Sequence, residues 1–391
     1  MVLYPIFWIL ALYIAHRKPN LKIGQVRTSR IGHMLGDCDL ALTPLVFNNK
    51  KQKIKILLAT EKHICNYYAL RLIQEIKSQH FILEIKSNLF VREYYYFVRK
   101  FTKFRRQLFE TRWLGSQTSN VINYPSIYVP TNQDRNEMKS WLYDKIGDRS
   151  NKPFVFLHNR DSAYLPSLSY HDYRNFSVDV FKPIIEKYRG QFNFFRGGKI
   201  ANEPLGREFD DCLIDLPFSE PTDLVDILAQ DRSEFYFGSD SGISSVSTVL
   251  RKPVATINHV SNCYEHIRRL NHLEFGFIPK KILNKRTGNL VGLVEMFENN
   301  WINFWDSNKF EESDLELIDN SSEDVADYFD EVLNFYKNNN KFEFILSGEQ
   351  EEFWKIVTYY LPESFEEKLI LDNCYISPSY LKKNMYLVSA R

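Results

Sequence analysis

Short apolar runs alternate with stretches of helical period along most of this 391-residue chain. Apolar runs that end in polar loops predict strands at residues 21–26, 54–59, 81–85, 154–158, 192–195, 213–216, 234–237 and 254–257. Strands separated by helices build a mostly parallel sheet, so an α/β protein is predicted. The length favours two domains, because single hydrophobic cores stop growing beyond about 250–300 residues.

Each half of the chain carries its own series of strands and helices, and a polar stretch with Pro125 and Pro130 separates them. The expected parts are an apolar segment at 1–20, an N-terminal domain at 21–150, a second domain at 151–345 and a mainly helical segment at 346–391. Helices are predicted at 64–76, 94–113, 178–188, 222–229 with Thr222 as the cap, 241–250, and from 322 onward.

The charges nearly cancel, with 50 Lys and Arg against 49 Asp and Glu, which removes the basic footprint of a dedicated nucleic-acid binder. If the protein binds a phosphate, a few neighbouring residues must hold it, because the overall charge does not attract it. The five cysteines are scattered and give neither a disulfide framework nor a Cys-x-x-Cys metal site, so a reducing, cytoplasmic compartment is expected. The chain also lacks HExxH, GxxxxGK[ST] and GxGxxG patterns, which disfavours metalloproteases, Walker-type NTPases and ordinary dinucleotide-binding proteins.

Residues 1–15 carry no charged side chain, and His16, Arg17 and Lys18 follow at once. This run is shorter than the about 20 apolar residues that cross a bilayer, and a signal peptide carries its positive charges before its apolar stretch. A buried first element, a monotopic anchor and part of a longer transmembrane segment all stay open. The basic, aromatic stretch 94–113 is either an ordinary helix with one solvated face or a helix that lies on an anionic membrane. Peripheral contact with the inner face of the cytoplasmic membrane is therefore the open alternative to a freely cytoplasmic location.

The sharpest local pattern is the run 234–250, where an apolar strand meets a Gly/Ser/Asp turn before a helix of small residues. The backbone N–H groups at such a helix start, together with the glycines, favour the close approach of a phosphate. The candidate phosphate-binding residues are Gly238, Ser239, Asp240, Ser241 and Gly242. The alternative is an ordinary helix capped by Ser239 or Asp240.

A second cluster follows the strand predicted at 154–158. Its candidate ligand-binding residues are His158, Arg160, Asp161 and Tyr164, and the later candidates Arg174, Arg196 and Gly197 also stand at a strand end or in a loop. Arginine is the side chain best shaped to grip a diphosphate through two parallel hydrogen bonds. A surface ion pair between Arg160 and Asp161 is the structural alternative.

In the first half, His33 and Asp39 stand after the opening strand. Ligands of parallel sheets bind at the carboxyl ends of the strands, so either side chain is a candidate general base on an acceptor hydroxyl. A purely structural hydrogen-bonding role is the alternative for both.

Taken in order, these blocks resemble a group of bacterial glycosyltransferases of surface-polysaccharide loci. The match runs over about residues 20–335, and its most specific parts are His-x-Arg-Asp at 158–161 and Gly-Ser-x-Ser-Gly at 238–242. The resemblance implies the GT-B fold, with two Rossmann-like domains that face a cleft. It further implies a nucleotide-sugar donor bound mainly by the second domain, a glycan or lipid-linked acceptor, and neither a cofactor nor a metal ion. The chain is also distantly similar to fucosyltransferases, in which an arginine of a comparable loop holds the donor diphosphate, a role that would fall on Arg160.

Metal-free sugar transfer requires protein groups that neutralise the leaving nucleoside diphosphate. The candidates are the helix that starts near Ser241 and one or more of Arg160, Arg174 and Arg196. Two rival functions stay open. One is a nucleotide-sugar epimerase or hydrolase on the same scaffold, and the other is a non-catalytic sugar-binding subunit of a capsule assembly complex. The non-catalytic protein would bind any donor without depending on Arg160.

Overall fold

The computed structural model describes residues 4–47, 54–111, 121, 123–163, 166–260, 274–338, 347–360 and 375–389. The chain forms two compact units, Met1–Arg135 with Val249–Arg251, and Asn136–Thr248 with Lys252–Arg391. Residues 1–20 thus belong to the first unit, and the C-terminal segment belongs to the second. The division falls inside helix α5 (Asn132–Ile146), earlier than the expected boundary at residue 150. The predicted α/β class with parallel sheets is confirmed.

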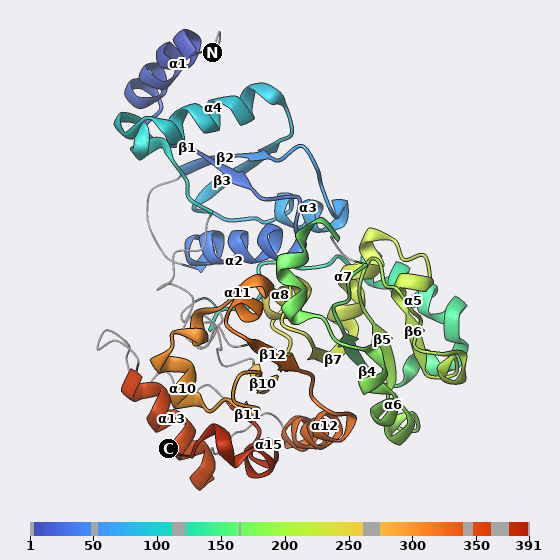
Figure 1. Cartoon of the computed structure of the whole chain (residues 1–391). Coiled ribbons are helices and arrows are strands. Elements are labelled where there is room, and N and C mark those ends of the chain that lie inside the picture. Colours follow the sequence, from blue (N-terminus) through green and yellow to red (C-terminus); the bar gives the residue numbers. More distant parts are fainter. Residues whose placement is uncertain are drawn as a thin grey trace. The chain divides into compact units, whose positions relative to one another are not determined.

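The first unit is built on a parallel sheet of β1 (Leu21–Val26), β2 (Ile54–Thr60) and β3 (Phe81–Lys86), in the order β1-β2-β3. Its helices are α1 (Tyr4–Arg17), α2 (Ile31–Phe47), α3 (Tyr67–Gln74) and α4 (Leu89–Lys100), and a 3-10 helix follows at Thr102–Gln107. Figure 1 shows α4, with α1 beyond it, on one side of this sheet and α2 on the other. All three strands begin where the sequence predicted them.

Asparagine side chains set the starts of two helices in this unit. Asn66 Oδ1 accepts a hydrogen bond from Ala69 N at 2.8 Å, and Asn88 Oδ1 accepts one from Val91 N at 2.9 Å. Because Asn88 caps α4, this helix begins earlier than the stretch 94–113 suggested. It ends at Lys100 and continues as the 3-10 helix; Trp113 lies outside the described residues.

Helix α1 contains most of the uncharged N-terminal run and buries one of its faces. Phe7, Ala11 and Ile14 pack in a core shared with Tyr94 and Phe97 of α4. The opposite face leaves apolar side chains exposed. None of the described helices is long and apolar enough to cross a membrane.

The second unit holds a six-stranded sheet of β4 (Phe154–His158), β5 (Asn193–Arg196), β6 (Leu213–Asp215), β7 (Ser233–Gly238), β8 (Val254–His259) and β9 (Glu274–Pro279). The spatial order is β6-β5-β4-β7-β8-β9, and every neighbouring pair is parallel. Counted from β4 this is the order 3-2-1-4-5-6, in which the direction of strand addition reverses between β4 and β7. The five strands predicted for this half are confirmed within a few residues at their ends.

Helices and a small antiparallel sheet complete the second unit. The sheet has the order β11-β10-β12, from β10 (Lys281–Asn284), β11 (Asn289–Leu290) and β12 (Leu315–Ile318). The helices are α6 (Lys182–Tyr188), α7 (Asp223–Arg232), α8 (Ser244–Val249), α10 (Leu293–Glu298), α11 (Ser307–Glu312), α12 (Ser322–Lys337), α13 (Gly348–Tyr360) and α15 (Pro378–Lys383). Short 3-10 helices lie at Gly147–Asn151, Pro166–Arg174, Val178–Phe181, Arg207–Phe209, Leu216–Phe218, Trp301–Asn303 and Met385–Leu387. The core of this unit joins the sheet to α12 and α13, with Phe237, Phe329 and Trp354 fully buried.

The predicted cap of α7 is confirmed, because Thr222 Oγ1 accepts a hydrogen bond from Val225 N. The helix predicted at 241–250 is wrong at its start, since α8 begins only at Ser244 and has six residues. The serine side chains of the preceding turn explain the delay. Ser244 Oγ donates to Ser241 O at 2.7 Å, and Ser241 Oγ accepts from Ile243 N at 3.3 Å, so a local turn replaces the first helical turn.

Candidate functional site

Three loops of the second unit meet at one edge of its sheet. They follow β5, β4 and β7, which are neighbours in this order and run parallel, so their carboxyl ends lie side by side. Open α/β sheets bind ligands outside the carboxyl ends of their strands, at the point where the strand order reverses, which here is between β4 and β7. The fold therefore gathers the blocks 158–161, 196–197 and 238–242 at the edge where a ligand is expected.

Gly238 allows the ends of β4 and β7 to approach closely. A β-carbon at this position would lie 2.0 Å from the carbonyl oxygen of His158, which no larger residue tolerates without a shift of the backbone. The same carbonyl accepts a hydrogen bond from Ser239 N at 2.8 Å. The two loops that start here are thus fixed to each other at their first residues.

His158 joins β4 to β5. Its Nδ1 lies 2.8 Å from the carbonyl oxygen of Gly197, and because that oxygen only accepts, Nδ1 carries the proton. Burial, together with the positive charge of Arg196, lowers the pKa of His158 to about 4. The ring is therefore neutral at pH 7, and Nε2 is left as a hydrogen-bond acceptor.

Arg196 is fully buried, and protein groups hold its guanidinium. Its Nε donates to Asn159 Oδ1 at 3.1 Å, and Nη1 donates to Glu203 O at 2.6 Å and pairs with Asp215 at 3.2 Å. Its Nη2 lies 3.9 Å from Asp161 Oδ2. The structure thus directs this arginine into the loops around β5.

Asp161 connects the loop after β4 to the loop after β5 through hydrogen bonds. Its Oδ1 accepts from Ala163 N and its Oδ2 accepts from Asn202 N, both at 2.9 Å. The structural alternative, a surface ion pair between Arg160 and Asp161, is not among the ion pairs of the described residues, whereas Arg196 Nη2 approaches Asp161. Tyr164, the remaining candidate of this loop, lies outside the described residues.

The charges of Arg160, Arg174 and Asp240 gather around the half-buried ring of Tyr173. Burial raises the pKa of the Tyr173 phenol, and the Arg174 guanidinium, 5.3 Å from the ring centre, opposes this rise. Asp240 adds to the rise, and Arg160 opposes it. Hydrogen bonds join two of these segments, since Phe176 N donates to Arg160 O at 3.1 Å and Asn159 Nδ2 donates to Phe176 O at 3.2 Å. The loop after β4 therefore lies beside the segment that follows Arg174. Arg160 itself is only 7% exposed.

The buried polar atoms of these loops that have no hydrogen-bond partner among the described residues include Arg174 Nε, Asn175 Oδ1 and Ser239 Oγ. Buried polar groups are nearly always paired, so such atoms are candidates for contact with a ligand. Ser239 is otherwise firmly placed, since its carbonyl accepts from the buried Tyr236 hydroxyl at 2.6 Å.

The turn before α8 offers less to an anion than its sequence suggested. The N–H of Ile243 is taken by Ser241 Oγ, and the N–H of Ser241 lies 3.4 Å from Ser244 Oγ. The six-residue α8 also has a small dipole. The arginines therefore contribute more positive charge here than the amides do. Across the described part of the chain, no group of three or more His, Cys, Asp or Glu side chains is arranged to hold a metal ion.

In the first unit, His33 and Asp37 occupy successive turns of α2. His33 Nδ1 lies 3.7 Å from Asp37 Oδ2, and Arg27 Nε donates to the same oxygen at 2.8 Å. The His33 side chain is 41% exposed, so its ring is open to a substrate. Asp37 is the partner that sequence reasoning did not select, although the four-residue spacing on a helix signals it.

Asp39 is buried, and a second arginine of the same unit holds it. Its Oδ2 accepts from Arg251 Nη1 at 2.9 Å and its Oδ1 from Arg251 Nη2 at 3.1 Å, while Thr43 Oγ1 also donates to Oδ1 at 2.8 Å. Burial raises the pKa of Asp39, and the hydrogen bonds from Arg251 oppose that rise. Both carboxylate oxygens are thus occupied.

Sequence reasoning missed other polar residues at the same sheet edge. Lys280 directly follows β9, and its Nζ pairs with Asp319 at 2.6 Å and donates to Asn175 O at 2.7 Å. At the end of β8, Asn258 exchanges two hydrogen bonds with Asn320. Arg196 was selected because it is a polar residue at the end of a predicted strand. The same criterion would also have selected Asn258. Lys280 had no such signal, because β9 was not predicted.

No family model and no curated protein matches this chain. Among solved structures, the chain is similar to the E. coli ADP-heptose LPS heptosyltransferase II, with a TM-score of 0.45 and 13% identity over 82% of this chain and 100% of that one. It is also similar to a family 9 glycosyltransferase from Veillonella parvula DSM 2008, with a TM-score of 0.39 and 11% identity over 60% of this chain and 80% of that one. Both scores lie below 0.5, so the function has to rest on the chain's own residues.

Proposed function

We propose that this chain is a glycosyltransferase that moves a sugar from a nucleotide-sugar donor to a glycan or lipid-linked acceptor in the synthesis of a cell-surface polysaccharide. The observation that carries the proposal is that the loops with Arg160 and Asp240 start at the neighbouring strands β4 and β7, where the strand order reverses. The carbonyl of Arg160 also accepts a hydrogen bond from Phe176 N, two residues after Arg174. Two guanidinium groups at such an edge suit an anionic diphosphate. The sugar-transfer step itself is proposed from the resemblance of the sequence blocks.

Arg160 and Arg174 are assigned to the donor diphosphate. Their positive charges would stabilise the negative charge that develops on the leaving nucleoside diphosphate, without a metal ion. The buried Arg174 Nε and Ser239 Oγ, which lack protein partners among the described residues, would gain hydrogen bonds from the donor. His158 is neutral, and its Nε2 would accept a hydrogen bond from a donor hydroxyl.

Arg196 and Asp161 are assigned positioning roles. Their hydrogen bonds to Asn159, Glu203 and Asn202 connect the loops after β4 and β5. They would hold the loop of Arg160 in its binding geometry without touching the donor. Gly197 and Gly238 would act in the same way, through the carbonyl contact with His158 and the close strand approach.

His33 is the proposed general base, and Asp39 is not, because Arg251 and Thr43 occupy both of its oxygens. Asp37 Oδ2 lies 3.7 Å from His33 Nδ1, so Nε2 is the ring nitrogen that would take the proton of the acceptor. In the proposed step the acceptor hydroxyl gives its proton to Nε2 and its oxygen bonds to the anomeric carbon. The bond from that carbon to the diphosphate breaks, and its electron pair leaves with the diphosphate.

Donor binding is tested by the replacement Arg160→Ala. The loss of a charged hydrogen bond is expected to weaken nucleotide-sugar binding by about 1–3 kcal/mol in calorimetric titration. The matched control is Arg286→Ala in the same unit, since Arg286 is exposed and pairs with Asp314 away from the sheet edge. Unchanged donor affinity in a folded Arg160→Ala protein would contradict the site and favour the non-catalytic alternative.

The base is tested by His33→Gln, measured as turnover with donor and acceptor. General base catalysis contributes about 10²- to 10⁴-fold, so kcat should fall by at least the lower of these factors while donor affinity stays unchanged. Release of free nucleotide with and without the acceptor separates transfer from hydrolysis. Release that is equally fast without an acceptor would exclude the transferase and favour the hydrolase.

A further inference from the structure

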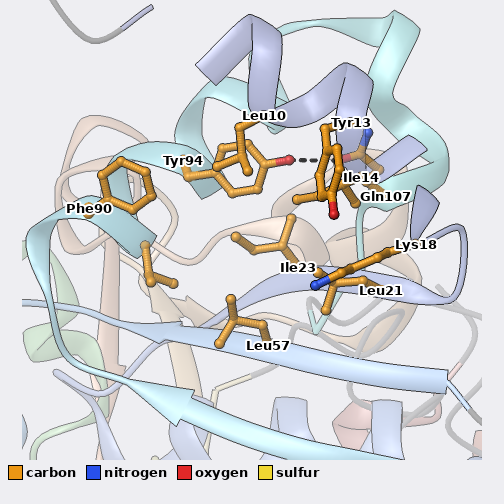
Figure 2. Close-up of a pocket in the computed structure, with 11 residues that line it drawn as sticks. Leu10, Tyr13, Ile14, Lys18, Leu21, Ile23, Leu57, Phe90, Tyr94 and Gln107 are labelled. Atoms are coloured by element: carbon orange, nitrogen blue, oxygen red, sulfur yellow. Dashed lines mark hydrogen bonds between the residues drawn. The ribbon is translucent and has the colours of Figure 1, made fainter. Parts of the chain in front are cut away.

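An apolar groove lies in the first unit between α1, α4 and the strands β1 and β2. It has a volume of about 220 Å³. Figure 2 shows Leu10 and Tyr13 on the side of α1, Phe90 on the side of α4, and Leu57 on the side of the strands. An engineered apolar cavity of about 150 Å³ is enough to bind benzene, so this groove has room for a larger apolar group.

Two of the polar side chains that line the groove, Tyr94 and Gln107, form hydrogen bonds within the protein. The Tyr94 hydroxyl donates to Gln107 Oε1 at 2.7 Å, and Gln107 Nε2 donates to Ala11 O at 2.7 Å. Figure 2 shows the first of these bonds beneath Tyr13. With these groups paired, the groove offers carbon surface to an occupant and has little to hold ordered water.

The rim of the groove is positively charged. Lys18 lines it, and in Figure 2 its nitrogen turns toward the groove. Within the described part of the chain, no carboxylate forms an ion pair with Lys18. The surrounding helical layer is basic as a whole, because residues 4–18 and 89–107 contain eight Lys and Arg side chains and a single acid, Glu93. The groove therefore combines an apolar interior with a cationic mouth.

We propose that this groove binds one aliphatic chain of an anionic amphiphile, with the chain between α1 and α4 and the anionic head group at Lys18. The hydrophobic effect favours transfer of the chain from water to the carbon surface, and the head group meets a positive field. The shared chemistry is an alkyl chain with a phosphate-like head. The source is a bilayer lipid, because helix α1 also leaves the apolar side chains of Ile6, Ile9 and Leu12 exposed. The inference is independent of the proposed sugar transfer, because none of the residues it uses is assigned to the donor or to the base.

The direct test is calorimetric titration of the full chain with alkyl phosphates of six to twelve carbons, each below its micelle concentration. Burial of each additional methylene should tighten binding about fourfold until the groove is full, after which affinity levels off. Alkanols of equal length should bind more weakly, because they lack the head-group charge. Affinity that does not depend on chain length, or no binding at all, would overturn the proposal.

A matched pair of variants on α1 locates the binding. Leu10 lines the groove and Leu12 is exposed outside it, so Leu10→Phe fills the groove, while Leu12→Phe adds the same volume elsewhere. Leu10→Phe should abolish binding of dodecyl phosphate, and Leu12→Phe should leave it unchanged. Equal effects of the two would contradict the assignment. If Leu10→Phe fails to fold, Lys18→Gln at the exposed rim serves as the second variant. It should weaken the binding of every alkyl phosphate by the same factor and leave the dependence of affinity on chain length unchanged.

Vesicles test whether the bound chain comes from a bilayer lipid. Co-sedimentation with vesicles of phosphatidylglycerol and phosphatidylcholine that is lost in Leu10→Phe identifies a bilayer lipid as the source. Binding of alkyl phosphates without co-sedimentation would overturn the bilayer lipid as the occupant and would show that the groove takes a soluble amphiphile. Co-sedimentation that Leu10→Phe does not change, without alkyl phosphate binding, would show a surface contact only and overturn the groove proposal.

Discussion

The neutral ring of His158 illustrates how single residues set the electrostatics of the candidate donor site. The ring is buried near Arg196 and Arg160, where a third positive charge would be unfavourable, and it donates from Nδ1 to Gly197. Its neutrality leaves the arginine charges available to an anion. This choice of protonation state has a measurable consequence for stability.

The stability of the second unit should fall in mild acid because of His158. The folded chain keeps the pKa of this ring at about 4, below the about 6.5 of an unfolded chain, so between these values only the unfolded state binds the proton. The stabilising contribution is thus complete above about pH 6.5 and is lost as the pH falls toward 4. From pH 7 to pH 5 the wild-type chain should lose about 2 kcal/mol more than His158→Gln in urea unfolding.

The control for this experiment is His63→Gln, because the side chain of His63 is exposed. Its replacement should leave the pH dependence as it is in the wild-type chain. A wild-type protein and a His158→Gln variant with parallel pH profiles would refute the neutral, buried ring.

At the scale of secondary-structure elements, the close approach of β4 and β7 is what places their two loops together. Gly238→Ala would put a β-carbon 2.0 Å from the His158 carbonyl and should destabilise the second unit by about 3 kcal/mol or more. The matched change Gly190→Ala, in a turn of the same unit where a β-carbon meets nothing within 4 Å, should cost little or nothing. Thermal unfolding of both variants measures the difference. Similar midpoints would show that the two strands tolerate separation.

Helices and strands were predictable from the sequence where neighbouring residues, such as an apolar run or a capping side chain, determine where the element begins. The strands at 21–26 and 154–158 were placed from their apolar runs, and α7 from Thr222. The start of α8 was not predictable, because serine side chains compete with the helix for the same backbone groups. The pattern of apolar residues contains no information on this competition. The roles of Arg196 and Asp39 were also beyond prediction. Their partners Asp215 and Arg251 come from separate segments that only the fold brings close.

At the scale of the whole molecule, an overall charge near zero conceals two local concentrations of positive charge. One is the helical layer of the first unit around the apolar groove, and the other is the pair Arg160 and Arg174 at the sheet edge of the second unit. The total of 50 basic and 49 acidic residues excludes a general polyanion binder but carries no information on such local sites. Their positions follow from the strand order, which the residue pattern alone does not specify.

Hydrogen exchange of the full chain, measured with and without a panel of nucleotide sugars, tests the central claim most directly. A donor held by the loops after β4 and β7 should slow exchange of the backbone amides at residues 159–163, 173–177 and 239–244, and Arg160→Ala should remove this protection at the same donor concentration. A nucleotide sugar that binds and leaves all three segments exchanging at their free rates would contradict the claim, as would a panel in which none binds.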